Sequence, residues 1–325
     1  MMNNSWKNRY VAPTPSLWTG RKDEPRNSRL FDQVQCVDLI NEPSFEAENR
    51  SFGFLGFSCD EGVRRNQGNQ GAASGPEALR KALASQPLHL KEPAVFYDFG
   101  DITCFDSDLE EAQSSLGKIV EQLHCHKIKP ILLGGGHEIS WGHYQGILSA
   151  HKDRSCGIVN FDAHFDLRSI TKDGKGSSGT PFFQIATRLT KEQQKFSYLC
   201  IGIQEQSNTA DLFQRAEELS VQYIKADDIH QNKSCKQAID RILEATDTIY
   251  LTICLDVFGA SFAPGVSAPQ VGGLSPMQVS PLIKYLVSSG KVIGFDIAEM
   301  CPSFDQRGMT ARLGASLIAS YIHLE

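Results

Sequence analysis

Short, nearly continuous apolar runs recur along most of this 325-residue chain, and they limit its possible folds more than any other feature. Each run has the length of one β-strand, and few of them show the polar alternation of a strand with one face in water. Such runs are typical of strands that are buried on both faces of a sheet. The eight candidate strands lie near residues 52–57, 94–99, 129–133, 156–161, 198–203, 221–225, 248–256 and 291–297.

Most segments between these runs carry apolar residues at helical spacing, and a last such segment closes the chain. This alternation predicts an α/β fold in which helices cover a mainly parallel sheet and ligands bind beyond the carboxyl ends of the strands. The first residues are rich in Pro, Asn and charge, so we expect residues 1–50 to form an arm packed on a single domain at 51–325. Helices are predicted at 76–85, 109–126, 138–151, 234–245, 275–289 and 310–322.

The composition argues against several classes of partner. The formal net charge is −6 and no block of lysine and arginine occurs, which speaks against binding to nucleic acid or to an anionic membrane surface. No segment approaches the roughly 18 uncharged apolar residues of a spanning helix, and the first residues lack the apolar core of a signal peptide. The nine cysteines are scattered through apolar runs rather than spaced as a disulfide framework. We therefore expect a protein of the reducing cytoplasm.

Polar motifs follow four of the predicted strands. Side chains two residues apart on an extended segment share a face, so Asp162, His164 and Asp166 can converge on one point. Because the carboxyl ends of parallel strands meet at one edge of the sheet, all four motifs are expected to lie there. The motifs are Gly-Gly-Gly-His-Glu at 134–138, Asn-Phe-Asp-Ala-His-Phe-Asp-Leu-Arg at 160–168, Asp256, and Asp-Ile-Ala-Glu at 296–299.

These motifs carry ligands that suit a divalent metal ion. A single His or Asp after a strand is more often a helix cap or a satisfied structural group, but their joint occurrence favours a metal site. Carboxylates that share a small buried site oppose one another's ionisation, and a divalent cation relieves that cost. A mixed imidazole and carboxylate set suits Mn²⁺, and two ions bridged by Asp162 would activate water for hydrolysis. The candidate ligands are His137, Asp162, His164, Asp166 and Asp256.

Three motifs resemble those of the ureohydrolases, the arginase and agmatinase family, and the similarity runs from about residue 50 to the C-terminus. They are Gly-Gly-Gly-His at 134–137, Asp-Ala-His-Phe-Asp at 162–166, and Cys-Leu-Asp-Val-Phe-Gly-Ala-Ser-Phe-Ala-Pro-Gly-Val-Ser-Ala-Pro-Gln-Val-Gly-Gly-Leu-Ser at 254–275. The resemblance implies an arginase/deacetylase-like fold: a three-layer α/β/α catalytic domain on an eight-stranded, mainly parallel sheet. It also implies two Mn²⁺ ions per subunit and suggests a homo-oligomer.

The resemblance further assigns roles by position. Glu299 falls where the family places a carboxylate that holds the cationic, amidine-like carbon centre of the substrate. Asp296 has two open interpretations: it either orients a ligand or serves only the backbone of its loop. The metal roles that the resemblance implies are His137 and Asp166 on one manganese ion, His164 and Asp256 on the other, and Asp162 as the bridge.

Two departures from the family pattern bear on the chemistry. Cys254 stands where the family supplies a second bridging carboxylate, and a thiolate is a poor partner for Mn²⁺. One metal site is then weakened with Cys254 as a possible ligand, or Cys254 simply packs as a small hydrophobe. The segment Ser-Ser-Gly-Thr-Pro-Phe at 177–182 lacks the histidine that arginase-like members use as a proton shuttle, which argues against arginase itself.

Arginines near the motifs predict a small-molecule substrate with carboxylates. Arg168 lies where arginases contact a substrate carboxylate, and a guanidinium forms bidentate pairs with such groups. A Gly-rich loop after the first predicted strand adds Arg64, Arg65 and Asn66, although a solvated charge pair explains either arginine equally well. With Leu-Trp-Thr-Gly-Arg at 17–21, these features resemble the formimidoylglutamase branch. Its members hydrolyse N-formimidoyl-L-glutamate to L-glutamate and formamide in histidine degradation, here by attack of metal-activated hydroxide on the amidine carbon.

Two other functions and one regulatory hypothesis stay open from the sequence. A guanidino-acid hydrolase, such as a guanidinobutyrase, would use the same arginines. A degenerate, non-catalytic family member would keep the fold for metal binding alone. Cys59 and Cys254 both lie near strand ends, so they form a possible redox pair if their Cα atoms come within about 7 Å.

Overall fold

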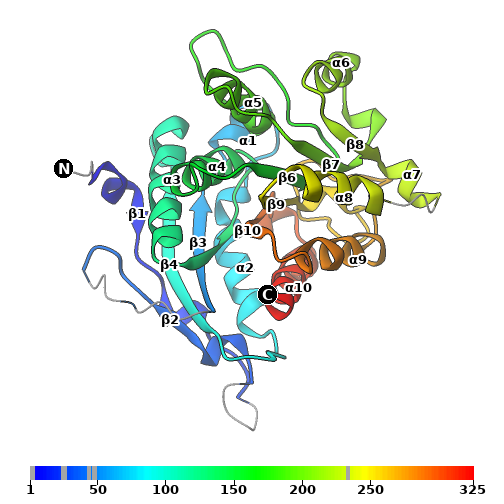
Figure 1. Ribbon diagram of the computed structural model, residues 1–325. Coiled ribbons are helices and arrows are strands. Elements are labelled where there is room, and N and C mark those ends of the chain that lie inside the picture. The colour runs from blue at the N-terminus through cyan, green and yellow to red at the C-terminus, as the bar shows by residue number, and fades with distance from the viewer. Residues whose placement is uncertain (1–3, 23–27, 42–44, 46–49, 232–234) are drawn as a thin grey trace.

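The computed structural model of the chain describes residues 4–22, 28–41, 45, 50–231 and 235–325. Within these residues a ten-stranded sheet crosses the molecule, and helices lie on both of its faces (Figure 1). The strand order is β1-β4-β3-β5-β10-β9-β6-β7-β8, and β2 also pairs with β4. The strands are β1 Tyr10–Val11, β2 Val34–Cys36, β3 Ser51–Ser58, β4 Val95–Thr103, β5 Ile128–Leu133, β6 Cys156–Phe161, β7 Tyr198–Ile203, β8 Gln222–Lys225, β9 Thr248–Cys254 and β10 Val292–Ala298.

The eight strands predicted from the apolar runs are present in the described part of the chain, as β3 to β10. The pairings among them are parallel, whereas β1 runs antiparallel to β4. Their apolar character has the expected cause, because all residues of β7 and β9 are buried. The prediction of a three-layer α/β/α fold on a mainly parallel sheet is therefore confirmed, but the sheet has ten strands instead of eight, because β1 and β2 add to β4 from the first 50 residues.

Helices connect most of the strands, and the six predicted helices are confirmed as α2, α3, α4, α8, α9 and α10. The helices α1, α5, α6 and α7 were not predicted. Among the described residues, no helix combines the length and the apolar character that crossing a bilayer requires. The helices are α1 Glu61–Arg65, α2 Gly75–Ala84, α3 Leu109–Cys125, α4 Ile139–Ala150, α5 Pro181–Lys191, α6 Ala210–Glu218, α7 Ala226–His230, α8 Lys236–Ala245, α9 Pro276–Val287 and α10 Met309–Leu324.

Each face of the sheet has its own apolar core. Phe52 and Phe54 of β3 belong to one core, and Leu55 and Phe57 of the same strand belong to the other, as the alternation of side chains along a strand requires. The helices α2, α8, α9 and α10 contribute to the first core, and α3, α4, α5 and α6 contribute to the second. Figure 1 shows α3 and α4 packed together on one side of the sheet and α9 and α10 together on the other.

Described parts of the first 50 residues pack against β4 and α2. Tyr10 of β1 pairs with Ile102 of β4, and β2 pairs with β4 on its own. The indole nitrogen of Trp18 donates a hydrogen bond to Asp98 Oδ2 at 2.7 Å, and its ring lies 5.4 Å from that of Phe54. The Leu-Trp-Thr-Gly-Arg motif at 17–21 thus places its tryptophan in the core.

Candidate metal centre

Four neighbouring strands bring the predicted ligands to one edge of the sheet. In the order β5-β10-β9-β6, the carboxyl ends of these strands lie side by side. Each functional side chain belongs to a short segment that leaves one of them. His137 follows β5, Asp162, His164 and Asp166 follow β6, Cys254 ends β9 and Asp256 lies just after it, and Glu299 follows β10.

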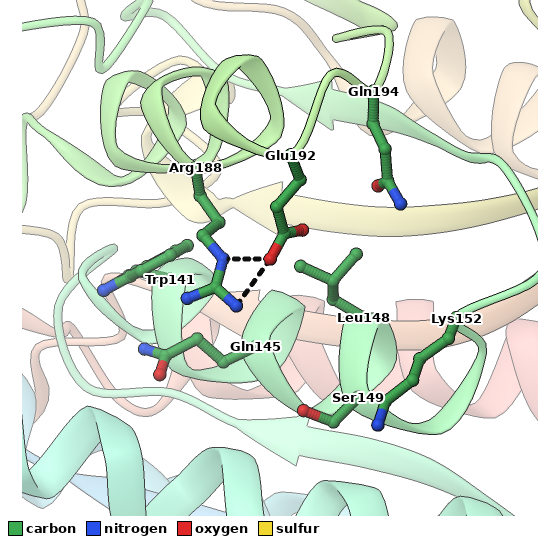
Figure 2. A pocket seen from close by; sticks show the side chains of 8 residues that line it. All are labelled: Trp141, Gln145, Leu148, Ser149, Lys152, Arg188, Glu192 and Gln194. Atoms are coloured by element: carbon green, nitrogen blue, oxygen red, sulfur yellow. Dashed lines mark hydrogen bonds and ion pairs between the residues drawn. The ribbon is translucent and has the colours of Figure 1, made fainter.

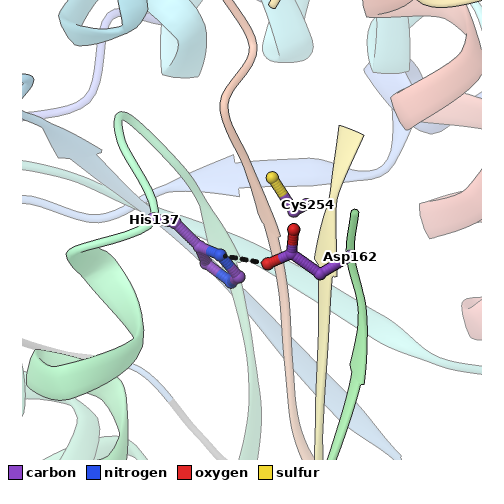
Figure 3. A group of neighbouring side chains, drawn as sticks. All are labelled: His137, Asp162 and Cys254. Atoms are coloured by element: carbon purple, nitrogen blue, oxygen red, sulfur yellow. Dashed lines mark ion pairs between the residues drawn. The ribbon is translucent and has the colours of Figure 1, made fainter. Parts of the chain in front are cut away.

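A first cluster forms around the imidazole of His137. Its Nδ1 lies 2.9 Å from Asp162 Oδ2 and 2.9 Å from Asp166 Oδ2. Ligand atoms of His137, Asp162 and Cys254 all lie within 4.8 Å of one another. Figure 3 shows His137 and Asp162 pointing toward each other from separate segments, with the Cys254 sulfur beside the Asp162 carboxylate. These three side chains are buried.

A second cluster shares Asp162 with the first. His164 Nδ1 lies 3.4 Å from Asp162 Oδ1 and 3.1 Å from Asp256 Oδ2, and the ligand atoms of these three residues also lie within 4.8 Å of one another. Asp162 therefore directs Oδ2 to the first cluster and Oδ1 to the second. That arrangement is what a carboxylate bridging two metal ions requires.

Two buried atoms show that the residues present fit a pair of divalent cations. His137 Nδ1 has no hydrogen-bond partner among the described residues, although two carboxylate oxygens lie 2.9 Å away. Asp256 Oδ1 is likewise buried without a partner there. A buried polar atom left without a partner costs about 1–3 kcal/mol. Imidazole nitrogens and carboxylate oxygens that converge in this way suit Mn²⁺, and a thiol is the softer exception.

The electrostatics of the two clusters favour a cation in the same way. Burial and the charge of Asp162 raise the pKa of Asp256, and they raise that of Asp166 to about 6. Burial also opposes ionisation of Asp162, but His137 and His164 outweigh it and hold the Asp162 pKa below its ordinary value. A divalent ion would stabilise all three carboxylates in their ionised form.

Two residues of the centre adopt a left-handed backbone conformation. Asp166 has φ of 48° and Glu299 has φ of 66°, values that residues other than glycine rarely adopt. Such strain costs on the order of 1 kcal/mol per residue and gathers at functional sites. The surrounding structure therefore holds the backbone of both residues in this conformation.

Glu299 is held by hydrogen bonds beside the first cluster. Its Oε1 accepts from the backbone N–H of His137 at 2.9 Å, and its Oε2 accepts from the Ser267 hydroxyl. Burial raises the pKa of Glu299 to about 7, with a further contribution from the charge of Asp256 and despite the Ser267 hydrogen bond. A cationic group placed next to this carboxylate would restore its ionised form.

A cavity of about 140 Å³ opens onto both clusters. Arg168 is exposed at this cavity, and Asn66 and Ser178 also line it. Ser207, Asn208 and Ser267 also line the cavity, although they were not among the predicted site residues. Ser207 and Asn208 follow the carboxyl end of β7, where ligands bind in parallel sheets, so their position in the sequence was a signal that could have identified them.

The structure corrects the prediction for Arg64 and Arg65. Both arginines pair with Glu61, at 2.6 Å from Arg64 and 2.9 Å from Arg65. Arg65 also bonds Glu110 at 2.7 Å and the carbonyl of Gly176 at 3.0 Å. Neither side chain is among those that line the cavity. Carboxylates of the chain itself engage both guanidinium groups, so in this arrangement they hold the loop rather than a substrate.

The predicted redox pair of Cys59 and Cys254 is wrong. Cys59 follows β3 and Cys254 ends β9, and the strands β5 and β10 lie between them. Three strand spacings amount to roughly 14 Å, twice the Cα separation that a disulfide allows. The Cys59 sulfur instead lies 3.6 Å from Glu138 Oε1.

A second cavity lies away from the metal centre. Figure 2 shows this surface cavity of about 350 Å³, lined by side chains of α4 and α5 and of the loops that follow them. Arg188 donates to Glu192, four residues further along the chain, at 2.6 Å. This cation is therefore matched by a neighbour on the same segment.

Comparisons with known proteins identify the family and agree with the fold. A sequence model of the arginase family matches residues 50–323. A formimidoylglutamase of Legionella pneumophila (strain Lens) is 44% identical over 315 residues, which cover 96% of this chain and 97% of that protein. A formimidoylglutamase of Clostridium tetani is 44% identical over 323 residues, covering 96% and 95%.

Solved structures resemble the chain over most of its length. The crystal structure of formimidoylglutamase from Bacillus subtilis has a TM-score of 0.80 at 24% identity and covers 94% of this chain and 93% of its own. That of Trypanosoma cruzi formiminoglutamase with Mn²⁺ has a TM-score of 0.77 at 25% identity, covering 86% and 95%. With its paired ligand clusters at the strand ends, this chain belongs to the arginase family.

Proposed function

We propose that this chain is a manganese-dependent formimidoylglutamase, which hydrolyses N-formimidoyl-L-glutamate to L-glutamate and formamide in histidine degradation. The observation that carries the proposal is the composition of one cavity. Two clusters that share Asp162 open onto it, and the carboxyl group of Glu299 and the guanidinium of Arg168 also line it. Relatives at 44% identity over nearly the whole chain carry the name formimidoylglutamase.

The substrate has charges that match this cavity. Its formimidoyl group is a cationic amidine, and its glutamate portion carries two carboxylates. Glu299 would hold the amidine N–H group, since its carboxylate is fixed by His137 and Ser267 and is buried. Arg168 would bind a carboxylate as a bidentate pair, with Asn66 as a neighbouring polar group.

The metal ligands divide between two sites. Manganese, when bound, would lower the pKa of a coordinated water toward neutrality and polarise the amidine carbon. Cys254 is a possible further ligand of the first site, and burial together with nearby carboxylates raises the pKa of its thiol. A soft thiol is a poor partner for Mn²⁺, so Cys254 would be a weak ligand. The ligand sets are His137, Asp162 and Asp166 for one ion, and Asp162, His164 and Asp256 for the other.

Asp162 and Ser178 would have separate roles at this cavity. The carboxylate of Asp162 is fully buried and is not among the groups that line the cavity, so it would serve the metals rather than the substrate. Ser178 lines the cavity in the segment where arginase-like relatives carry a histidine. A serine hydroxyl is a poor proton shuttle at neutral pH, so the leaving nitrogen receives its proton from water or another group.

A substrate panel tests the proposal. Protein loaded with Mn²⁺ is incubated with N-formimidoyl-L-glutamate, 4-guanidinobutyrate, L-arginine and agmatine, and the release of formamide or urea is measured. We expect turnover of N-formimidoyl-L-glutamate, loss of it with chelator, and recovery with added Mn²⁺. Faster release of urea from 4-guanidinobutyrate would identify a guanidino-acid hydrolase instead. Absence of turnover with less than about one bound ion per chain would indicate a non-catalytic member.

The variant Arg168→Met tests the binding of the substrate carboxylate. We expect KM for N-formimidoyl-L-glutamate to rise at least about tenfold with little change in kcat, because the lost ion pair is remote from the reacting carbon. Arg188→Met removes an arginine from the cavity of Figure 2 and serves as the matched control. Equal KM values for the Arg168 variant and the parent protein would show that Arg168 does not bind the substrate.

A further inference from the structure

A row of polar side chains crosses the sheet beneath the metal ligands. The register pairs Asn160 of β6 with Thr252 of β9, and Thr252 with Asp296 of β10. All three side chains are buried. Asn160 and Thr252 each stand two residues before a residue of the first cluster, Asp162 and Cys254, so their side chains point to the same side of the sheet. Polar groups in such a position are costly unless they are hydrogen-bonded.

Thr252 connects the carboxylate of Asp296 to the imidazole of His137. His137 Nε2 lies 3.0 Å from Thr252 Oγ1, and Thr252 Oγ1 lies 2.5 Å from Asp296 Oδ1. A hydroxyl has one proton to donate and a carboxylate only accepts, so Thr252 donates to Asp296 and accepts from His137. The proton of the neutral imidazole is then on Nε2, and Nδ1 carries the lone pair.

Asp296 is itself held in place on its other oxygen. Tyr250 donates its hydroxyl to Asp296 Oδ2 at 2.6 Å, and His143 Nδ1 donates to the same oxygen at 2.6 Å. The rings of His143 and Tyr250 pack edge to face with centroids 4.8 Å apart. Asp296 lies behind Thr252, away from the cavity lining, and so does not touch a substrate there.

The free Nδ1 of His137 faces the first cluster. It lies 2.9 Å from one oxygen of Asp162 and one of Asp166, and neither contact is a hydrogen bond. A histidine ligand is generally oriented by a hydrogen bond to its other nitrogen, and removing such a partner typically costs 10–100-fold in metal affinity. We infer that Thr252 and Asp296 are positioning residues that fix the proton on Nε2 of His137 and so hold Nδ1 toward the first metal ion.

This inference rests on the proposed manganese sites and answers the question that the sequence left open for Asp296. Asp296 acts on the metal through Thr252 and His137 rather than serving only the backbone of its loop. The effect is specific to one site, because His164 of the second cluster stands on a different segment and its side chain is 24% exposed. Loss of the Thr252 hydroxyl should therefore weaken one manganese site and spare the other.

Manganese binding measures the effect without relying on catalysis. Equilibrium dialysis and the electron paramagnetic resonance of bound Mn²⁺ give the affinities of the two sites for the whole protein and for Thr252→Val. We expect one site to weaken by about 10–100-fold and the other to change by less than about threefold. Thr252→Ser keeps the hydroxyl and should restore the parent affinity.

A matched control and a second variant complete the test. Thr248→Val makes the same change on the same strand, where the hydroxyl bonds Ser155 O at the far end, and should leave both affinities unchanged. Asp296→Asn should weaken the same site as Thr252→Val. If Thr252→Val does not unfold cooperatively, and is therefore not properly folded, the manganese affinities of Asp296→Asn alone test the inference. Two parent-like affinities in both variants would overturn the inference while the proposed function stands. A parent protein that binds no Mn²⁺ would overturn both.

Discussion

Two groups of buried charges lie on the same sheet, and they differ in the source of their positive charge. Beside β4, the guanidinium of Arg80 donates to Asp98 through Nε and Nη2 at 2.9 Å each and to Asp101 through Nη1 at 2.8 Å. At the ends of β6 and β9, three carboxylates lie beside imidazoles alone. The first group contains a permanent cation, and the second contains bases that are neutral when they bind metal.

This difference separates a structural charge cluster from a binding site. In the first group, burial lowers the pKa of Arg80, but Asp98 and Asp101 outweigh it and raise the pKa above its ordinary value. The arginine is therefore charged under all conditions in which the protein folds. In the second group the carboxylates oppose one another, and an external divalent ion is the natural counter-charge. The predictions below test whether the two groups differ in this way.

The largest effect is expected for Asp162→Asn, because Asp162 serves both metal sites. Removal of the bridging charge should lower kcat/KM for N-formimidoyl-L-glutamate on the order of a thousandfold or more, since the metals supply several kcal/mol of stabilisation. The variant should also bind less Mn²⁺ in equilibrium dialysis. Parent-like manganese binding would place the ions elsewhere.

Arg80→Met should affect stability and leave the metal centre intact. The substitution leaves Asp98 buried without its cation, which typically costs about 3 kcal/mol or more. Urea unfolding should show this loss, whereas the folded variant should bind Mn²⁺ with the parent affinity. A variant with unchanged stability would show that the two charge groups do not differ as described. Lys81→Met, whose side chain pairs with Glu77 at the surface, is the matched control.

Cys254→Asp should strengthen the first metal site. The sulfur of Cys254 lies within 4.8 Å of ligand atoms of His137 and Asp162, and burial and the neighbouring carboxylates raise the pKa of its thiol. A carboxylate at this position is a harder ligand, so we expect the Mn²⁺ affinity of that site to rise about tenfold. Cys254→Ala distinguishes the two interpretations of the cysteine. A weaker site in that variant identifies a ligand, and an unchanged site identifies a packing residue.

The smallest effect concerns Glu138, a buried carboxyl next to the centre whose Oε1 accepts from the backbone N–H of Gly62 at 2.8 Å. Burial, with a contribution from the charge of Glu299, raises its pKa to about 8. The folded protein then keeps a proton that the unfolded chain releases, so stability falls as the pH rises from the ordinary carboxyl range to about 8. In Glu138→Gln this fall should shrink by at least about 1 kcal/mol, measured by denaturant unfolding with chelator present. If the unfolding free energy falls with pH by the same amount in the parent protein and in Glu138→Gln, the raised pKa of Glu138 is contradicted.

The strands and the location of the centre followed from local sequence patterns. Burial on both faces gives β7 and β9 their mainly apolar sequences, and polar residues that follow such runs gather at one edge of a parallel sheet. The helix α5 was missed because Pro181 and Phe182 were assigned to a loop motif. Its buried residues Phe182, Ile185 and Leu189 do stand at helical spacing, so the sequence contained the signal.

Properties that depend on topology could not be inferred in the same way. Cys59 and Cys254 are far apart because β5 and β10 lie between their strands. A local sequence pattern does not predict the order of strands in a sheet. The role of Arg65 depends partly on Glu110, which comes from α3 far along the chain. The polar row had a visible signal, since Thr252 and Asn160 are polar residues within apolar runs. Their partners appeared only once the register placed them beside each other and beside Asp296.

The central claim is that two manganese ions share Asp162 at the ends of β6 and β9. Anomalous diffraction at the manganese absorption edge, from crystals grown with Mn²⁺, tests it most directly. The account predicts one peak among His137, Asp162 and Asp166 and a second among Asp162, His164 and Asp256. Crystals that contain Mn²⁺ but show no peak at these side chains would contradict it.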